Sequence, residues 1–400
     1  MAKVIVVGAG PAGIMASISA SDNNEVILIE RNGEIGRKLR LTGGGRCNIT
    51  NYRPIEEIFN KVVTNRKFLY SAFYSFTNED LLSYLSEHNL KYKVEYDEKV
   101  YTESDKSDDV IRVFYDDIKK RDINILFNTM VKDLVVEDSE VKGIVTDSGE
   151  VIKADKVIIT TGGKSFPQTG SDGSMYEILR NHGHNIKTAM PALVPLVTKE
   201  DFVKNLQGVS MKDVVFSAKI KKKKIDVTGD MIFTHFGISG PAVLKLSSYI
   251  NKELNDNNVT VQVDFLPAVS KDEISSVIRG NNNKTVFNNM KGLLPQNFLK
   301  EILSLLNLSD TKVHDLKKED ENRLITFIKA MELTIRETLS IKAAMVTSGG
   351  IDVKEVNAST LESKIIKNLY FAGEVLDVDA ETGGYNLQIA FSTGHLAGMD

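Results

Sequence analysis

Three glycines near the N-terminus have the spacing of a phosphate-binding turn. The segment GAGPAG, residues 8–13, follows the β-branched run VIVV and precedes an uncharged stretch that ends near Ser21. Gly8 would allow a tight turn, Gly10 would let a pyrophosphate approach the backbone, and Gly13 would let a helix pack closely on the strand. The N-terminus of that helix would present free N–H groups and a positive dipole end to the phosphates.

A carboxylate farther along the chain strengthens this interpretation. Residues 25–30, EVILIE, predict a second buried strand that ends in Glu30, 22 positions after Gly8. A carboxylate at that place accepts hydrogen bonds from the ribose hydroxyls of an adenosine. Strand, turn, helix and acid together predict a dinucleotide half-site, and both FAD and NAD use this pattern.

A second glycine-rich segment, KLRLTGGGRCNITN at 38–51, combines three consecutive glycines with cations and the only cysteine of the chain. Its glycines allow backbone N–H groups to approach a ligand, and Arg37, Lys38 and Arg46 can neutralise a pyrophosphate or stabilise an electron-rich ring. The alternative is a solvated loop whose glycines only turn the chain. Cys47 is either a thiol beside the ligand or a packed, inert residue, and the lack of a second cysteine to resolve a disulfide favours the inert interpretation.

The composition is that of a large protein without a charge bias. A chain of 400 residues exceeds the size at which single cores stop growing, so two or three structural units are expected. A net charge of −4 gives no general electrostatic reason to bind nucleic acid or anionic lipid.

One cysteine excludes a disulfide framework and a cysteine-rich zinc site, and we expect a cytoplasmic protein. The glycines within the uncharged stretch at 4–21 argue against a signal peptide or a membrane span.

The elements that must position these motifs predict a Rossmann-like, three-layer α/β domain. Residues 132–163 alternate apolar and polar side chains, as in a β-meander that returns to a buried strand, and Gly162 lies at the end of that strand. Residues 368–373 predict a final strand, and the glycine turn after it opens an apolar helix from about Asn386. The ligand-binding edge of a parallel sheet lies at the carboxyl ends of its strands.

Between these parts the pattern changes, which indicates an inserted domain. Short alternating stretches predict a β-rich, barrel-like part, and the later segments show the three- and four-residue apolar spacing of helices, including NRLITFIKAMELTI at 322–335. The predicted boundaries are 1–189 and 343–400 for the dinucleotide domain, 190–268 for the β-rich part and 269–342 for the helical part.

The motifs as a set resemble one known family. The chain is similar to the bacterial BaiN-like, or aminoacetone-oxidase-like, NAD(P)/FAD-dependent flavoproteins. Two departures, Tyr101-Thr102 in place of Phe-Pro and SDGS in place of a compact Gly-Asp-Gly, affect substrate details more than FAD binding. The resemblance is carried by GRKLRLTGGGRCNITN at 36–51, ESDKSDDV at 103–110, TTGGKSFPQTGSDG at 160–173, GDMIFTHFGISGPAVL at 229–244, and residues 346–398.

The resemblance implies a noncovalent FAD-binding domain and a flavin that exchanges a hydride with NAD(P)H, a transient co-substrate, and with a small organic substrate. It implies that the backbone of Val131 meets the adenine, that Asp377 lies near the ribityl or phosphate portion, and that the start of the last helix faces the ring. The expected cofactor-binding residues are Gly8, Gly10, Ala12, Gly13, Glu30, Arg31, Lys38, Thr42, Arg46, Cys47, Asn48, Val131, Gly162, Gly373, Glu374, Asp377, Asn386, Leu387 and Gln388.

Three residues are candidates for catalysis. Arg46 would act beside the flavin, and His235 in THFGISGP or Tyr385 could donate a proton to the substrate. The alternative for His235 is a turn histidine bonded to the local backbone. No histidine or cysteine pair has the spacing of a metal site, so no metal is expected.

The expected partner is a small molecule, with neither nucleic acid nor membrane. The lysine run KIKKKK at 219–224 could contact nucleic acid, but without interleaved aromatics a solvated hairpin or a protected sheet edge is favoured. Other functions stay open: an amine-type oxidase using oxygen, a fumarate-reductase-like or RNA-modifying flavoprotein, or a non-catalytic, redox-responsive flavin-binding protein. The sequence does not specify the oligomeric state.

Overall fold

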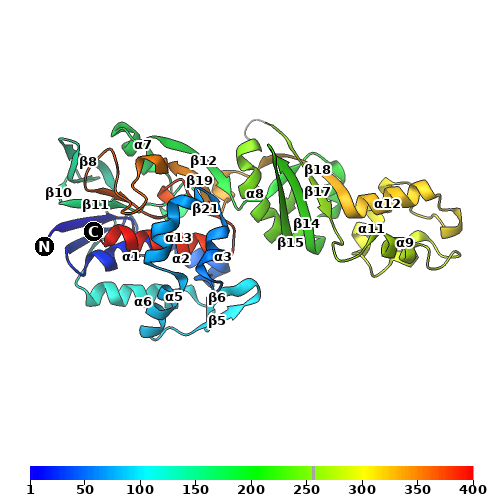
Figure 1. The fold of residues 1–400 in the computed structure, drawn as a ribbon, viewed down its shortest axis with the longest axis horizontal. Helices are drawn as coiled ribbons and strands as arrows, with labels where there is room; N and C mark the ends of the chain where they lie inside the picture. The colour runs from blue at the N-terminus through cyan, green and yellow to red at the C-terminus, as the bar shows by residue number, and fades with distance from the viewer. Residues whose placement is uncertain (255–256, 400) are drawn as a thin grey trace. The chain divides into compact units, whose positions relative to one another are not determined.

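The structure, a computed structural model, describes residues 1–254 and 257–399, which form two compact units (Figure 1). The first unit comprises Met1–Pro191 and Ile341–Asp400, and the second comprises Ala192–Ser340. Each unit has its own hydrophobic core. Among the residues described, no helix has the length and apolar character needed to span a membrane.

The first unit is built on a five-stranded parallel sheet with the strand order β20-β11-β1-β2-β7. The central strand β1 pairs with β2 on one side and with β11 on the other, and its apolar residues are buried. A continuous run of β-branched residues suits such a strand because both of its faces are covered. The strands are β1 (Lys3–Val7), β2 (Glu25–Ile29), β7 (Asn124–Leu126), β11 (Lys156–Ile159) and β20 (Leu369–Phe371).

Two helices from opposite ends of the chain lie side by side next to this sheet, α1 (Pro11–Ala20) and α13 (Tyr385–Gly398) (Figure 1). Glycine makes their close approach possible, because a Cβ atom on Gly394 would lie 2.2 Å from the Ala12 carbonyl oxygen. An antiparallel meander forms another layer and contacts β11 through its middle strand: β8 (Val131–Glu137), β9 (Glu140–Thr146) and β10 (Val151–Lys153). This is the predicted Rossmann-like, three-layer α/β architecture.

Smaller elements complete the first unit. One short sheet has the order β3-β6-β5, with β3 (Thr50–Asn51), β6 (Lys99–Thr102) and β5 (Tyr92–Glu95). Two further sheets pair β4 (Val62–Thr64) with β21 (Asp379–Ala380) and β12 (Ile186–Ala192) with β19 (Val346–Ile351). The remaining helices are α2 (Arg37–Leu41), α3 (Ile55–Asn60), α4 (Tyr70–Ser75), α5 (Asn78–Glu87), α6 (Ser107–Lys120) and α7 (Ser174–Asn181).

The second unit is a closed barrel with a helical excursion. The barrel order is β13-β16-β15-β14-β17-β18. Its strands are β13 (Leu196–Thr198), β14 (Ser210–Ile220), β15 (Lys223–Phe233), β16 (Gly237–Ser239), β17 (Val259–Asp264) and β18 (Met331–Thr338). Its helices are α8 (Pro241–Leu254), α9 (Lys271–Ile278), α10 (Val286–Met290), α11 (Gln296–Leu305) and α12 (Lys318–Ala330).

The division of this insertion differs from the predicted one. The helical part does not follow a completed barrel, because β18 comes after the helices and closes the barrel against β13 and β17. The helix predicted through 322–335 was wrong at its end: it stops at Ala330, and Met331 begins a strand. In that strand Met331, Leu333 and Ile335 are buried at every second position, and the short alternation was mistaken for the end of a helical pattern.

Candidate functional site

The three glycines of the first motif have separate physical roles. Gly8 has φ of +103° and donates its N–H to the Ile29 carbonyl at 2.7 Å, which forms the tight turn after β1. A Cβ atom on Gly13 would lie 1.8 Å from the Gly8 carbonyl oxygen, so only glycine lets α1 pack here. A Cβ atom on Gly10 would meet nothing within 4 Å. Because no side chain caps α1 at Gly10, this turn offers open space beside helix N–H groups, which fits a pyrophosphate.

The acid expected at the ribose lies beside this turn. Glu30 is buried, its Oε2 accepts the Ala9 N–H at 2.8 Å, and its Oε1 accepts the backbone N–H of Asn32 at 2.8 Å. The carboxylate therefore holds the turn at Gly8–Gly10 in place. A carboxylate oxygen can accept more than one hydrogen bond, so a ribose hydroxyl fits the same group. The neighbouring Arg31 instead pairs with Asp172 at 2.6 Å.

A second acid, Glu374, forms a polar cluster after β20. Its Oε2 lies 2.6 Å from Lys38 Nζ, and its Oε1 accepts hydrogen bonds from the Thr347 N–H at 2.7 Å and the Ser165 hydroxyl at 2.8 Å. Burial acts to raise the pKa of Glu374, but Lys38 and these hydrogen bonds outweigh it and hold the pKa below its usual range. The cluster joins four segments that are distant in sequence, and a fifth of the Glu374 side chain stays exposed (20%).

Glycines line the loops around this cluster. A Cβ atom on Gly162 (φ +75°) would lie 2.8 Å from Ser171 Oγ, and one on Gly373 (φ +76°) would lie 2.8 Å from Ala12 Cβ. Gly373 thus brings the loop after β20 close to the first turn of α1, and a Cβ atom on Gly8 would lie 2.9 Å from the Thr160 carbonyl oxygen at the end of β11. The carboxyl ends of the parallel strands therefore converge on the glycine turn, which is where an open α/β sheet binds its ligand.

The second glycine-rich segment forms a short turn that buries the cysteine. Gly43 and Gly44 both have left-handed φ values, and Thr42 Oγ1 donates to the Leu39 carbonyl at 2.7 Å. Cys47 is fully buried, and burial raises the pKa of its thiol to about 12 despite a hydrogen bond with Thr42. The thiol is therefore protonated at neutral pH and is not a nucleophile in this arrangement.

Arg46 is engaged by its own chain. Its guanidinium lies 4.1 Å from the centre of the Tyr101 ring, pairs with Asp105 at 2.7 Å, and also pairs with Glu95. The two carboxylates orient the guanidinium, and 34% of the Arg46 side chain stays exposed. The arrangement supports a role in holding the turn at Thr42–Gly45 against β5 and β6 more directly than a role in catalysis.

The end of this segment holds the start of α13 through hydrogen bonds and close backbone packing. With the Asn48 amide oriented to satisfy both neighbours, its oxygen accepts the Gly384 N–H at 3.0 Å and its nitrogen donates to the Thr50 carbonyl at 3.0 Å. Asn51 Nδ2 donates to the Gly383 carbonyl at 3.1 Å. A Cβ atom on Gly384 would lie 2.4 Å from the Thr50 carbonyl carbon. The segment at 38–51 and the turn at Gly383-Gly384 therefore meet, although the bonded residues Asn51 and Gly383 are 332 positions apart in the sequence.

The side chains at the start of α13 point into the protein. Tyr385 is buried and its hydroxyl accepts a hydrogen bond from Arg53 Nη1 at 2.7 Å. Asn386 bonds to the backbone of Ala380, and Gln388 bonds to Thr50 Oγ1 at 2.7 Å. The amide groups predicted to reach the ring are thus satisfied by the chain itself. What stays available to a ligand is the backbone of the first turn of α13, which no side chain caps.

The other predicted residues lie at separate places. Asp377 is buried, and its Oδ2 accepts from Asn65 Nδ2 at 3.0 Å. Val131 opens β8 and is buried. His235 belongs to the second unit, where it is exposed in the turn before β16 and packs edge-on against Phe236 at 5.0 Å.

Several residues of the site were missed. Arg53, Asn65, Ser165 and Thr347 hold predicted site residues through the hydrogen bonds given above. Ser165 and Thr347 fall within the motif blocks at 160–173 and 346–398, which was the available signal. Their partners cannot be read from one sequence because they lie far away along the chain.

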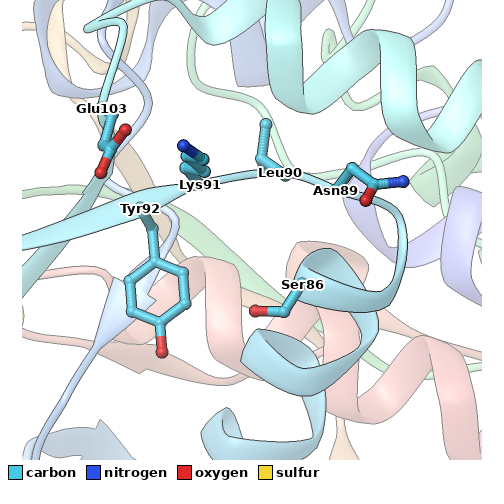
Figure 2. Close-up of a pocket in the computed structure, with 6 residues that line it drawn as sticks. All are labelled: Ser86, Asn89, Leu90, Lys91, Tyr92 and Glu103. Carbon is cyan, nitrogen blue, oxygen red and sulfur yellow. The ribbon is translucent and has the colours of Figure 1, made fainter.

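Neither a metal centre nor a pocket lined by predicted site residues is found in the part of the chain that the structure describes. No group of three histidine, cysteine, aspartate or glutamate side chains within 1–254 and 257–399 could hold a metal ion. A pocket of about 410 Å³ lies where α5 leads into β5 (Figure 2). It contains no predicted site residue; its lining residues are Ser86, Asn89, Leu90, Lys91, Tyr92 and Glu103.

The fold and this arrangement of turns define a Rossmann-type nucleotide-binding protein, and the family and relatives described next are those of FAD-dependent oxidoreductases. The chain belongs to the HI0933-like protein family, whose Rossmann-domain profile matches residues 2–400. This finding confirms the family resemblance predicted from the motifs.

Characterised relatives match almost the whole chain. A 3-dehydro-bile acid delta(4,6)-reductase from Clostridium scindens is 30% identical over 410 residues, covering 100% of this chain and 98% of the relative. Ribosomal RNA dihydrouridine synthases from Escherichia coli and Haemophilus influenzae are each 28% identical over 401 residues, covering 99% of this chain and 97% of each relative.

Solved structures support the fold. A 3-ketosteroid-delta4-(5alpha)-dehydrogenase from Rhodococcus jostii superposes with a TM-score of 0.55 at 14% identity, covering 100% of this chain and 96% of that one. A quinol-fumarate reductase gives a TM-score of 0.51 at 15% identity, covering 99% of this chain and 70% of that one. At these identities the likeness concerns architecture alone.

Proposed function

We propose that this protein passes a hydride between NAD(P)H and an organic small molecule, with noncovalently bound FAD between them. The observation that carries the proposal is the open space at Gly10, at an uncapped helix N-terminus beside the buried Glu30. FAD, when bound, supplies the two-electron chemistry that side chains lack.

The residues of the chain would then divide the work of binding. Backbone N–H groups at Ala12 and Gly13 would hold the pyrophosphate, and Glu30 would accept the ribose hydroxyls. Lys38 and Glu374 would line the middle of the cofactor. The uncapped first turn of α13 would favour negative charge on the ring through its dipole, which raises the reduction potential.

The nicotinamide cofactor is assigned a transient role. The sequence has a single GxGxxG pattern, at 8–13, whereas a dedicated nicotinamide domain would normally add its own. The relative named as a bile acid delta(4,6)-reductase supports an unsaturated ring ketone as the acceptor. His235 and Tyr385 stay candidates for the proton donor.

An anaerobic titration tests this proposal. NADH or NADPH should bleach the flavin band near ~450 nm, and an unsaturated ring ketone should restore it. If the band persists with both nucleotides but is bleached by an amine, the protein is an amine-type oxidase and the proposed direction of electron flow is wrong.

A second candidate is reduction of uridine in RNA. It is favoured by the two relatives named as ribosomal RNA dihydrouridine synthases and by the lysine hairpin between β14 and β15. Lys219 and Lys224 stand directly opposite each other there, and Lys221, Lys222 and Lys223 are also exposed. Like charges in such a pair repel, so the hairpin concentrates positive charge at a cost that binding of phosphates would offset.

RNA binding and turnover separate this candidate from the first. The triple substitution K219Q/K222Q/K223Q should weaken binding of a uridine-rich RNA and flatten its salt dependence, whereas K271Q/K291Q/K312Q removes equal charge from exposed positions elsewhere in the unit. Dihydrouridine in the RNA, measured by mass spectrometry after incubation with NAD(P)H, is the expected product. Equal binding by both triple variants would contradict the hairpin's part in this candidate.

A further inference from the structure

The tip of the β5–β6 hairpin has an unusual backbone. Asp97 and Glu98 are consecutive non-glycine residues with φ of +63° and +55°, in the left-handed region. Left-handed φ values are uncommon for non-glycine residues but recur at hairpin turns, as at Asp138 and Ser139 between β8 and β9. This tip also makes contacts outside its own hairpin.

Those contacts converge on one arginine, Arg53. Its Nη2 lies 2.6 Å from Asp97 Oδ1, and its Nη1 also faces the Asp97 carbonyl at 3.4 Å. The same Nη1 donates to the Tyr385 hydroxyl at 2.7 Å. Glu57, from α3, adds a looser pairing with Arg53 Nε at 3.5 Å. The hairpin tip thus presents a carboxylate and a carbonyl that orient the guanidinium toward Tyr385.

Tyr385 transmits this restraint to α13, of which it is the first residue. Its side chain is 1% exposed. Its ring packs against Gly383, where a Cβ atom would lie 2.7 Å from the ring. Burial raises the pKa of Tyr385 to about 12, although the Arg53 guanidinium acts in the opposite direction. The phenol therefore stays protonated and is held by a charge-assisted hydrogen bond, which is stronger than a neutral one.

A second link connects the same two places. Asn51 Nδ2 donates both to the Asp97 carbonyl at 3.0 Å and to the Gly383 carbonyl at 3.1 Å. The hairpin tip and the turn before α13 are therefore joined through one side chain and, separately, through Arg53. Asn51 fixes the turn, and Arg53 fixes the first residue of the helix.

We propose that Arg53 is a positioning residue that sets where the N-terminus of α13 meets FAD and contributes positive charge there. The inference rests on the proposed function, because it requires FAD at this helix. Loss of the guanidinium would free the start of the helix and remove a charge that favours the reduced, anionic ring. FAD binding and the FAD reduction potential should then change together.

The test compares the FAD complexes of the wild type, R53M, R53K and a control, R66M. Arg66 is an exposed arginine in the same unit, bonded to Asn60 at 3.0 Å. R53M should weaken FAD binding to the apoprotein roughly tenfold or more, as expected for one lost charge-assisted hydrogen bond, and make the midpoint potential more negative. R53K should recover part of the potential, because it keeps the charge, and R66M should match the wild type.

Y385F guards the test against a folding defect in R53M, because it keeps the ring and removes only the hydroxyl. It should weaken FAD binding, and its effect should not add to that of R53M, since both break the same hydrogen bond. The inference is overturned if Y385F and R53M bind FAD with wild-type affinity and potential, or if R66M shifts the potential equally. Failure of the wild type to bind FAD would instead refute the proposed function.

Discussion

Glu321 of the second unit and Glu374 of the first are both acids surrounded by cations and donors, yet their settings differ. Glu321 lies on α12 with a side chain 1% exposed. It accepts from Arg279 Nε at 2.9 Å, lies 3.1 Å from Lys318 Nζ, and is bonded to Ser275 as well. Arg279 also donates to the carbonyls of Val313 and Leu316, so the group joins α9, α12 and the turn between α11 and α12. This acid is fully occupied by structural contacts.

Glu374 is held by a comparable number of partners, but they come from three different kinds of element: Lys38 from the short helix α2, Ser165 from the loop after β11, and Thr347 from the start of β19. A Cβ atom on Gly163 would lie 2.3 Å from Thr347 Oγ1, and left-handed glycines flank the acid at Gly162 and Gly373. The Glu374 side chain is 20% exposed, against 1% for Glu321. An acid saturated between helices stabilises a fold, whereas an acid accessible among glycine loops can also take a ligand.

Among the predicted effects on ligand binding, that of Gly10→Leu should be the largest. The backbone there has φ of −78°, which leucine adopts freely, and a Cβ atom meets nothing within 4 Å, so the fold should survive. The side chain would occupy the space assigned to the pyrophosphate, and FAD should be lost. Flavin absorbance of the purified variant measures this. A folded, yellow, fully loaded Gly10→Leu protein would refute the proposed site.

On the structural side, Arg279→Met should destabilise the second unit. It leaves the buried Glu321 carboxylate without its main cation, and breaking a buried pair costs about 3–5 kcal/mol. Chemical denaturation should show the loss, while the FAD content of the first unit stays that of the wild type. If the variant lost FAD while its stability stayed unchanged, Glu321 would act in ligand binding, and its assignment as a purely structural acid would be wrong.

Lys38→Met should act in the opposite sense, on FAD more than on stability. The folded pKa of Glu374 lies below its ordinary value of 4.5, so its stabilisation is present above about pH 4.5 and is lost as the pH falls through the lower folded pKa. Without Lys38 that pKa should rise, and FAD should be released at a higher pH than from the wild type. Flavin fluorescence during an acid titration measures release, and identical curves would contradict the assignment.

The smallest expected effect concerns Cys47 and tests how tightly the chain packs after the turn at Thr42–Gly45. Its burial and a thiol pKa of about 12 predict slow alkylation by iodoacetamide at neutral pH. Labelling should follow unfolding, as mass spectrometry across a denaturant series would show. Rapid labelling of the folded protein would place the thiol in an open, reactive setting.

The local parts of the account could be predicted from the sequence. The strand, turn and helix at Gly8 to Gly13 follow from patterns within a few residues, because Gly8 and Gly13 meet their own turn or a neighbouring strand and Gly10 leaves open space. The acid after β2 follows from the fixed length of a helix and a strand. The assignment of these residues to FAD stays a prediction that the geometry supports.

The parts that could not be predicted depend on distant partners. Lys38 and Glu374 are 336 positions apart, and Arg53 and Tyr385 are 332 apart. The partners of Arg46, Glu95 and Asp105, likewise lie 49 and 59 positions away, and its place at the ligand stays a prediction. Strand β18 was missed because its partners β13 and β17 precede a whole helical segment.

Titration of the apoprotein with FAD tests the central claim most directly. The account predicts saturation at one FAD per chain, with quenched or shifted flavin fluorescence and no comparable binding of NAD⁺ to the same site. Stoichiometric binding of NAD⁺ that excludes FAD, or no binding of FAD by the folded chain, would contradict it.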